Sequence, residues 1–360
     1  MQSLPNGKID EDIKQFITLD ESLYDLMCSL IGFEITTENN EFNSTMLGNE
    51  LTQGSSLEIT YCSNNEKNPF LYFFLTEILY LNYKNTFEAG PIIEIVLFDN
   101  FNNLNIINLH LILAQKLGDL GDQNKRDEII KDLLKKLYIY RPYTKKDFLL
   151  NLKAVGTVID KNKFLKVVII DSINSFQFFE DTHRKGDFDM GKDKKRMSIN
   201  VKKNFYKEVN ARIQENIQKL VNMEKLCTIL FKREYFKMQD SIAWDETRSK
   251  FCINPRLSGH LNNRIFTTRK ICLINFENIN DSTVDILNKM TRTDKKHIMI
   301  DRQPNLNLAI IKPDSQTQTQ NLVMTTYSFT ELYFQVLNWF QIGSDDYFFT
   351  SRENFHHVNG

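Results

Sequence analysis

A carboxylate at the end of a buried strand is the feature of the sequence that most suggests chemistry. The run from Phe164 to Ile170 is almost entirely apolar, and Asp171 and Ser172 follow it directly. In nucleotide-binding α/β proteins, an aspartate at the carboxyl end of such a strand holds Mg²⁺ directly or through water. The alternative is that Asp171 merely caps the segment that follows. The sequence leaves both interpretations open.

A phosphate-binding loop has to follow the first strand of the core and precede a helix. The segment in that place is Cys62, Ser63, Asn64, Asn65, Glu66, Lys67, Asn68 and Pro69. A phosphate cradle needs glycines whose backbone N–H groups wrap the anion, a lysine, and a hydroxyl for Mg²⁺. This segment has Lys67 but no glycine, Pro69 has no N–H, and Glu66 adds negative charge. We therefore expect a connection from strand to helix that holds no triphosphate, so ATP and Mg²⁺ are not expected as cofactors.

A basic stretch over residues 183–207 is the second candidate site. It carries nine Lys and Arg against three Asp, a net charge of +6. A flexible basic loop suits contact with the phosphates of DNA, and a solvated insertion that touches nothing fits equally well. The same run resembles a nuclear-import signal. The candidate DNA-binding residues are Arg184, Lys185, Lys192, Lys194, Lys195, Arg196, Lys202 and Lys203.

The elements that must position these residues alternate between strands and helices. Continuous apolar runs predict strands over residues 57–61, 91–98, 137–140, 164–170 and 226–231. Helical spacing predicts helices over residues 70–83, 104–114, 148–155 and 205–220. The expected apolar stripe of the second helix is Leu104, Ile107, Leu111 and Ala114. Thr144 and Asp147 form a capping box for the third of these helices. The alternation indicates a mainly parallel sheet, and the strand-like runs beyond residue 260 predict an antiparallel edge.

The composition excludes several classes of protein. Lys and Arg total 45 against 46 Asp and Glu, which rules out a uniformly basic nucleic-acid coat. The five cysteines include no C-x-x-C pair, so neither a zinc ribbon nor a disulfide framework is expected. His356 and His357 have no ligand at metal-site spacing. The longest apolar block, residues 70–81, is too short to span a bilayer. We expect a soluble intracellular protein with no metal and no membrane partner.

Four stretches, taken in order, resemble the RecA-type recombinase core. The similarity is greatest to the eukaryotic recombinase paralogues of the X-ray-repair cross-complementing type. The stretches are residues 57–76, 96–117, 168–176 and 213–231. Residues 340–348 also look like the closing strand pair of this family.

The resemblance implies an α/β fold of the RecA-like, P-loop NTPase type: a mainly parallel sheet flanked by helices, with an antiparallel C-terminal edge. It divides the chain into an acidic N-terminal helical segment (1–55), a RecA-like core (56–260) and C-terminal strands that close the core (261–360). Residues 277–340 look like an insertion. The apolar stripe of Leu23, Leu26 and Leu30 is expected to dock on a partner's core.

The departures from the family pattern concern its catalytic residues. Asn68 stands in the place of the phosphate-loop lysine, Pro69 in that of the hydroxyl, Phe101 in that of the catalytic acid and Tyr235 in that of the polar sensor. The resemblance thus implies a nuclear accessory subunit for homologous-recombination repair. Such a subunit pairs with other recombinase paralogues and binds single-stranded or branched DNA without efficient ATP hydrolysis. The alternatives are an active DNA-dependent ATPase with a non-standard phosphate loop and a purely structural partner subunit.

Overall fold

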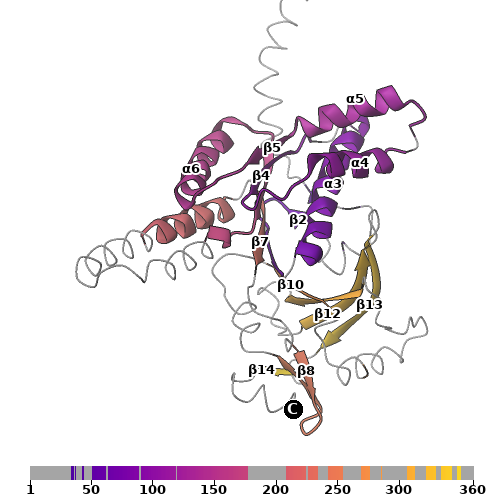
Figure 1. Cartoon of the computed structure of the whole chain (residues 1–360), viewed down its shortest axis with the longest axis vertical. Helices are drawn as coiled ribbons and strands as arrows, with labels where there is room; N and C mark the ends of the chain where they lie inside the picture. The colour runs from indigo at the N-terminus through magenta and orange to yellow at the C-terminus, as the bar shows by residue number, and fades with distance from the viewer. Residues whose placement is uncertain are drawn as a thin grey trace, which may run out of the picture.

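The fold is of the α/β class, with helices on both faces of a large sheet, as the sequence predicted. The computed structural model describes residues 34–35, 37, 43, 51–61, 64–88, 91–118, 120–176, 208–223, 226–233, 242–253, 269–275, 285, 306–312, 322–329, 334–342 and 347–349. These residues form a nine-stranded sheet, a three-stranded sheet and a two-stranded sheet. Figure 1 shows the parallel part of the large sheet, where β4, β5 and β7 are labelled, between two groups of helices, with β10, β12 and β13 below them.

The large sheet is the scaffold of the molecule. In spatial order its strands are β13 (Phe334–Ile342), β12 (Leu322–Phe329), β11 (Leu306–Lys312), β10 (Arg269–Asn275), β3 (Ser56–Tyr61), β7 (Cys227–Arg233), β6 (Leu165–Asp171), β4 (Glu94–Asp99) and β5 (Leu137–Tyr140). The helices that flank it are α3 (Asn64–Glu88), α4 (Ile106–Lys116), α5 (Gln123–Leu134), α6 (Lys145–Lys161) and a helix over residues 208–221.

The two small sheets lie outside this scaffold. In one, β1 (Glu34–Ile35) pairs with β2 (Leu51–Thr52). The other consists of β8 (Ile242–Asp245), β9 (Lys250–Ile253) and β14 (Tyr347–Phe349).

Six neighbouring strands of the large sheet, from β10 to β5, are parallel, and their order creates a switch point. Within the large sheet, the chain first forms β3, crosses by α3 to β4, and then reaches β5 at the edge. It then returns by α6 to β6 and by residues 208–221 to β7, beside β3. In open α/β sheets, ligands bind outside the carboxyl ends of the strands at such a reversal.

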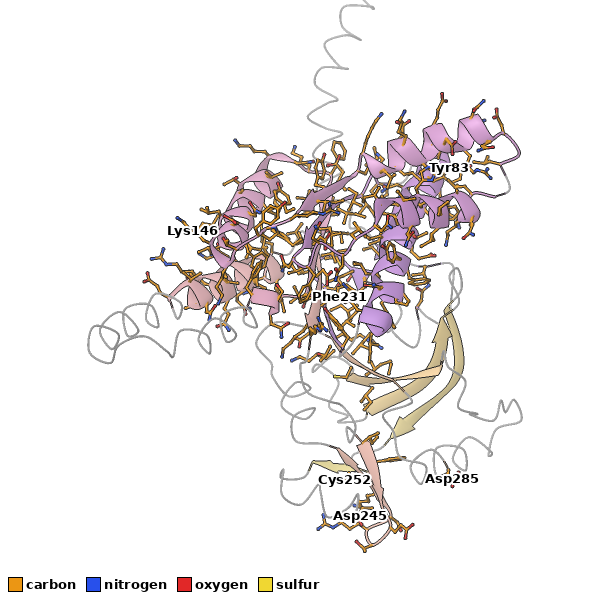
Figure 2. All side chains as sticks on the ribbon, in the orientation of Figure 1. Tyr83, Lys146, Phe231, Asp245, Cys252 and Asp285 are labelled. Carbon is orange, nitrogen blue, oxygen red and sulfur yellow. The ribbon has the colours of Figure 1, made fainter. Side chains whose placement is uncertain are left out.

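Each face of the sheet packs on its own group of helices, because successive side chains of a strand point to opposite faces. Helices α3, α4 and α5 cover one face, formed by Ile59, Ile95, Ile169 and Phe231 among others. Helix α6 and residues 208–221 cover the other face, formed by Val96, Phe98, Val168 and Leu230 among others. Phe231 is labelled in Figure 2 at the middle of the sheet. The long apolar strands therefore are buried on both faces, as in other parallel sheets.

The side-chain amides of two asparagines each make two hydrogen bonds to the backbone at the end of a strand. The Asn82 amide donates to the Ile93 carbonyl (2.7 Å), and its Oδ1 accepts from the Ile93 N–H (2.7 Å), which ties α3 to the start of β4. Asn174 does the same for Arg233 at the end of β7, at 2.5 and 3.0 Å. A side-chain amide carries one donor group and one acceptor, so it can replace a backbone peptide.

One pair of helices differs from the sequence prediction. The predicted helix at residues 104–114 exists as α4, but Ile107 and Leu111 of its expected apolar stripe face outward, and Leu109 and Leu113 are buried instead. Because α4 is apolar around most of its circumference, periodicity could not identify the inner face. The prediction also missed α5, whose N-terminus is capped by Asp122.

The antiparallel edge beyond residue 260 is confirmed. Strands β10, β11, β12 and β13 pair antiparallel in sequence, so the residues that looked like an insertion supply most of this extension. The expected closing pair at residues 340–348 is wrong. Strand β13 ends at Ile342 in the large sheet, whereas β14 pairs with β9 in the small one. The prediction came from the family resemblance alone, and a resemblance in sequence does not specify which sheet a strand joins.

The buried cysteines of the sheet provide a test of the fold. Cys227 and Cys272 are buried in β7 and β10, and burial raises the pKa of each thiol to about 12. At pH 8 only about one thiol in ten thousand is then ionised, and the thiolate is the reactive form. We expect iodoacetamide to label both residues readily in concentrated urea and hardly at all in native buffer, as measured by peptide mass spectrometry. Equal labelling in both conditions would contradict the sheet described here.

Candidate functional site

The candidate site lies at the carboxyl edge of the parallel strands. Because β3, β4, β6 and β7 run in the same direction, their last residues Tyr61, Asp99, Asp171 and Arg233 meet at this edge. Helix α3 leaves from the same edge, directly after β3. The sequence predicted this location for Asp171 and for the segment 62–69.

A buried ion pair occupies the centre of the site. The Lys67 Nζ lies 2.6 Å from Oδ2 of Asp171, and both side chains have 0% exposure. The Ser172 hydroxyl donates to the other carboxylate oxygen, Oδ1, at 2.7 Å. The Tyr61 hydroxyl is hydrogen-bonded to Ser172 Oγ, and the Lys67 ammonium lies 5.8 Å from the Tyr61 ring centroid. Each oxygen of Asp171 therefore already has a protein partner.

Lys67 reaches Asp171 because α3 starts unusually early. The helix begins at Asn64, so two residues separate it from the end of β3 at Tyr61. The prediction of a loop through Pro69 is wrong: Lys67, Asn68 and Pro69 lie inside α3. The helix tolerates Pro69 near its start, where the missing N–H removes one bond to the carbonyl of residue 65. A phosphate loop needs glycines whose backbone N–H groups surround the anion, and this sequence has none before α3. The helix therefore begins where a phosphate loop would lie.

The electrostatics of the pair explain why it must stay intact. Burial raises the pKa of Asp171 and is the largest influence on it. The Lys67 charge and the hydrogen bonds from Lys67 and Ser172 act in the opposite direction, and the Asp99 charge raises the pKa further. A buried charge without its partner costs several kcal/mol, so Asp171 depends on Lys67 for its charge balance.

These residues do not fit a magnesium nucleotide. Mg²⁺ requires oxygen ligands at about 2.1 Å with near-octahedral geometry. The Asp171 oxygen that would face such an ion is in contact with the Lys67 ammonium at 2.6 Å. The ammonium supplies positive charge to the carboxylate where a metal would otherwise do so.

Both oxygens of the second carboxylate at the edge, Asp99, also accept hydrogen bonds from the protein. Asp99 Oδ1 accepts from the Asn103 N–H at 2.9 Å. Its Oδ2 accepts from the Leu104 N–H at 3.2 Å and from Arg141 Nε at 3.1 Å. Phe101 lies under the Arg233 guanidinium, with the guanidinium carbon 5.5 Å from the ring centroid. Asp99 thus shapes the turn after β4 and has no free oxygen to activate a water.

A tight turn after Asp171 connects the site to the neighbouring strand. Ser172 has a left-handed backbone with φ of 60°, which is uncommon for a residue other than glycine. Its carbonyl accepts from the Ser175 N–H at 2.9 Å and from the Asn100 amide at 3.3 Å. The Ile173 N–H donates to the Phe231 carbonyl at 2.9 Å. Neighbouring strand ends therefore hold Ser172 in place beside Asp171.

The structure brings together part of the predicted site. Asp171 and Lys67 meet, and Ser172, named with Asp171 in the sequence, lies beside them, whereas Tyr61, Asn100 and Arg141 were not identified from the sequence. The sequence marks these residues only weakly, since each is a single polar residue at or just after a strand end. Several predicted residues lie outside the described part of the chain: Cys62, Ser63, the side chains of Asn64, Asn65 and Glu66, Tyr235, Leu23, Leu26, Leu30, and all eight basic residues from Arg184 to Lys203.

Comparison of the whole chain with known proteins gives no family assignment. No model of a known protein family matches the chain, and a search among curated proteins finds no match either. Within the described residues, none of the helices is both long enough and apolar enough to cross a bilayer.

The ion pair predicts a specific pattern of stability changes. Lys67→Met or Asp171→Asn should each lower the free energy of unfolding by about 3–5 kcal/mol, because each leaves an uncompensated buried group. Combining Lys67→Met with Asp171→Leu should cost less than the sum of Lys67→Met and Asp171→Leu made singly, because no charge is left buried in the double variant. Urea unfolding measures all of these values.

A matched control is the exposed ion pair on the helix over residues 208–221, in which Lys219 Nζ lies 3.1 Å from Oε1 of Glu215. Lys219→Met should change stability by less than about 1 kcal/mol, because water screens an exposed pair. If Lys67→Met cost no more than Lys219→Met, the buried pair would not have the importance assigned to it here.

Proposed function

We propose that the chain is an accessory subunit of a recombinase-paralogue complex in homologous-recombination DNA repair. In this role it binds partner paralogues and single-stranded or branched DNA in the nucleus without efficient ATP hydrolysis. The observation that carries the proposal is a RecA-like sheet whose nucleotide edge is closed by the Lys67–Asp171 ion pair. The family resemblance of residues 57–76, 96–117, 168–176 and 213–231 supports the same assignment.

The Lys67–Asp171 ion pair suggests how the proposed subunit differs from one that depends on nucleotide. In a nucleotide-dependent subunit, bound nucleotide orders the segment between the first strand and its helix. Here α3 already begins at Asn64, and Lys67 supplies the charge that Asp171 requires. The subunit can therefore present its surfaces to a partner without a bound nucleotide, as a constant part of a complex in which other members hydrolyse ATP.

The composition of residues 183–207 supports the DNA-binding part of the proposal. This stretch carries a net charge of +6. Phe176 precedes it and Asn210 follows it in the sequence, and both line a pocket beside the ends of β6 and β7. A basic stretch between two such residues suits contact with the phosphates of a single strand.

The ATPase activity provides the first test. The chain should release no phosphate from ATP above the rate of the blank, with or without single-stranded DNA, in a colorimetric phosphate assay. The physical reason is that Lys67 occupies the carboxylate that would hold Mg²⁺. Steady hydrolysis that disappears in Asp171→Ala would instead favour the alternative of an ATPase with a non-standard phosphate loop.

The salt dependence of DNA binding provides the second test. Changing Lys192, Lys194, Lys195 and Arg196 to Ala should weaken binding to a labelled oligonucleotide at low salt. For each phosphate that is no longer neutralised, the log–log salt slope should also become flatter by roughly 0.7 on a single strand. Fluorescence anisotropy across a salt titration measures both quantities.

The control for this test removes the same charge elsewhere. Lys125, Lys131, Lys135 and Lys136 lie on or just after α5, on the face of the sheet opposite α6. Their replacement by Ala should leave affinity and slope close to those of the parent. If the two quadruple variants had the same affinity and the same salt slope, the result would favour a structural subunit whose basic segment contacts no DNA.

A further inference from the structure

The outward face of α6 carries positive charge that no described residue neutralises. Its lysines Lys146, Lys153 and Lys161 are exposed, and within the described part of the chain none of their ammonium groups forms an ion pair or a hydrogen bond. The helix over residues 208–221 differs, because its exposed Lys219 pairs with Glu215 four residues away. In α6, the positions three and four residues from each of the three lysines hold no acid.

The two acids of α6 do not offset this charge. Asp147 belongs to the capping box, where its carboxylate accepts from the Thr144 N–H at 3.1 Å. Asp160 is the sequence neighbour of Lys161 and stands seven residues from Lys153, and neither spacing is that of a helical ion pair. With four lysines and two aspartates, α6 has a formal charge of +2. The outward face can therefore attract an anionic partner.

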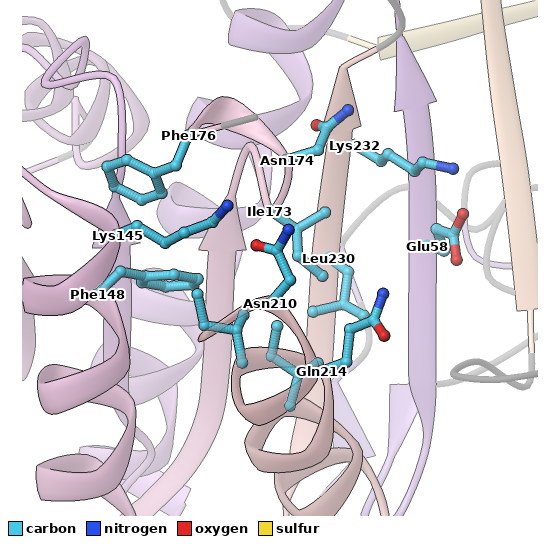
Figure 3. Close-up of a pocket in the computed structure, with 12 residues that line it drawn as sticks. Glu58, Lys145, Phe148, Ile173, Asn174, Phe176, Asn210, Gln214, Leu230 and Lys232 are labelled. Atoms are coloured by element: carbon cyan, nitrogen blue, oxygen red, sulfur yellow. The ribbon is translucent and has the colours of Figure 1, made fainter. Parts of the chain in front are cut away.

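The opposite face of α6 is buried, which fixes the direction of the lysine face. Leu152 and Val155 pack in the core that α6 shares with residues 208–221. In Figure 3, Lys145 and Phe148 extend from α6 toward a pocket of about 260 Å³ beside the ends of β6 and β7. Lys146 is labelled in Figure 2 on the outer side of the helix. The fold therefore holds the lysine face away from the sheet.

An apolar ridge runs along the same outward face. Leu150 is 53% exposed, Val158 is 38% exposed, and Ala154 between them is exposed as well. Residues four positions apart form one ridge on the surface of a helix. Leu150 lies one turn from both Lys146 and Lys153, so the start of the ridge is set among the lysines.

The ridge decides which kind of anionic partner fits. An exposed leucine gains free energy only when an apolar group covers it. A phosphate backbone would satisfy the lysines and leave the ridge in water, and a bilayer surface requires a broader apolar face than one ridge. An amphipathic helix with acids beside its apolar stripe meets both requirements.

We propose that the outward face of α6 docks an acidic amphipathic helix of a partner protein. The apolar stripe of that helix packs on the ridge of Leu150, Ala154 and Val158, and its acids lie beside the three lysines. Packing of such a ridge into the groove of a second helix is a common helix–helix arrangement. Lys146 and Lys161 are about 22 Å apart along the helix axis at 1.5 Å per residue, so the partner helix has at least about 15 residues.

The chain's own acidic N-terminal sequence is the less suitable occupant. It leads into β1, and Ile35 of β1 is buried in the core on the α3 side of the sheet. Helix α6 covers the opposite face of the sheet. We therefore assign the docked helix to a partner. This inference needs neither DNA nor a recombinase paralogue, so it is independent of the proposed function.

The experiment uses the full chain and a fluorescein-labelled peptide of about 18 residues, built from Leu, Glu and Ala with the leucines at i, i+3, i+4 and i+7 spacing. A second peptide has the same composition in an order without a stripe. The triple variant Lys146→Glu, Lys153→Glu and Lys161→Glu reverses the charge of the face, and Leu150→Gln removes the largest residue of the ridge. Anisotropy at about 0.15 M salt measures binding, and thermal unfolding confirms that each variant is folded.

The matched control makes the same charge change on another helix. Lys125→Glu, Lys131→Glu and Lys135→Glu alter three exposed lysines on or just after α5. We expect the α6 triple variant to weaken binding of the striped peptide at least about tenfold and Leu150→Gln to weaken it about three- to fivefold. The α5 variant should weaken it by less than about twofold, because screened charges far from the site contribute little.

Several results would overturn the proposal. They are no binding of the striped peptide, equal binding of the peptide without a stripe, and equal losses in the two triple variants. A loss of oligothymidylate binding in the α6 variant with peptide binding unchanged would assign the face to nucleic acid. If an unlabelled peptide of residues 9–31 displaced the probe at lower concentration than the unlabelled probe does, the occupant would be this chain's own acidic sequence. Failure of peptide binding would leave the proposed function unaffected.

Discussion

The contact between Lys67 and Asp171 determines how the first third of the core is arranged. A carboxylate with no exposed surface needs a cation, and here the cation belongs to the same chain. Helix α3 places that cation by beginning two residues after β3, which leaves no long loop of the kind in which nucleotide-binding α/β proteins hold phosphate. The early helix in turn lets Phe70, Phe74 and Ile78 pack on the sheet from the first turns onward. The early start of the helix that covers the central strands thus meets the charge requirement of Asp171.

The sequence predicted the elements better than it predicted their ends and contacts. Strands such as residues 165–171 are recognisable because burial on both faces leaves an uninterrupted apolar run. The start of α3 was misplaced because Pro69 suggested a boundary, whereas the position of the helix depends on a residue more than one hundred positions away, Asp171. The outer face of α4 was also misassigned, since its burial is decided by α3 and α5 rather than by its own pattern.

For the candidate site, sequence reasoning identified residue types but not pairings. Asp171 was recognised from the strand that precedes it, and Lys67 from its place after the first strand. Their direct contact could not be foreseen, because it requires the register of β3, β7 and β6 to be known. The pocket beneath residues 208–221 was missed for a similar reason. Its lining residues come from five separate segments, and none of them belongs to a recognisable motif.

The central position of β3 has a consequence for how the protein is made. Its two neighbours in the sheet, β7 and β10, lie far later in the chain, so Leu57 pairs with Ile229 and Arg269. At a synthesis rate of about 5–20 residues per second, the ribosome needs on the order of 10–40 s after β3 to complete both neighbours. During that interval β3 has two open edges, and α3 has an incomplete surface to cover. The nascent chain therefore needs protection from aggregation, by a chaperone or by an already folded partner.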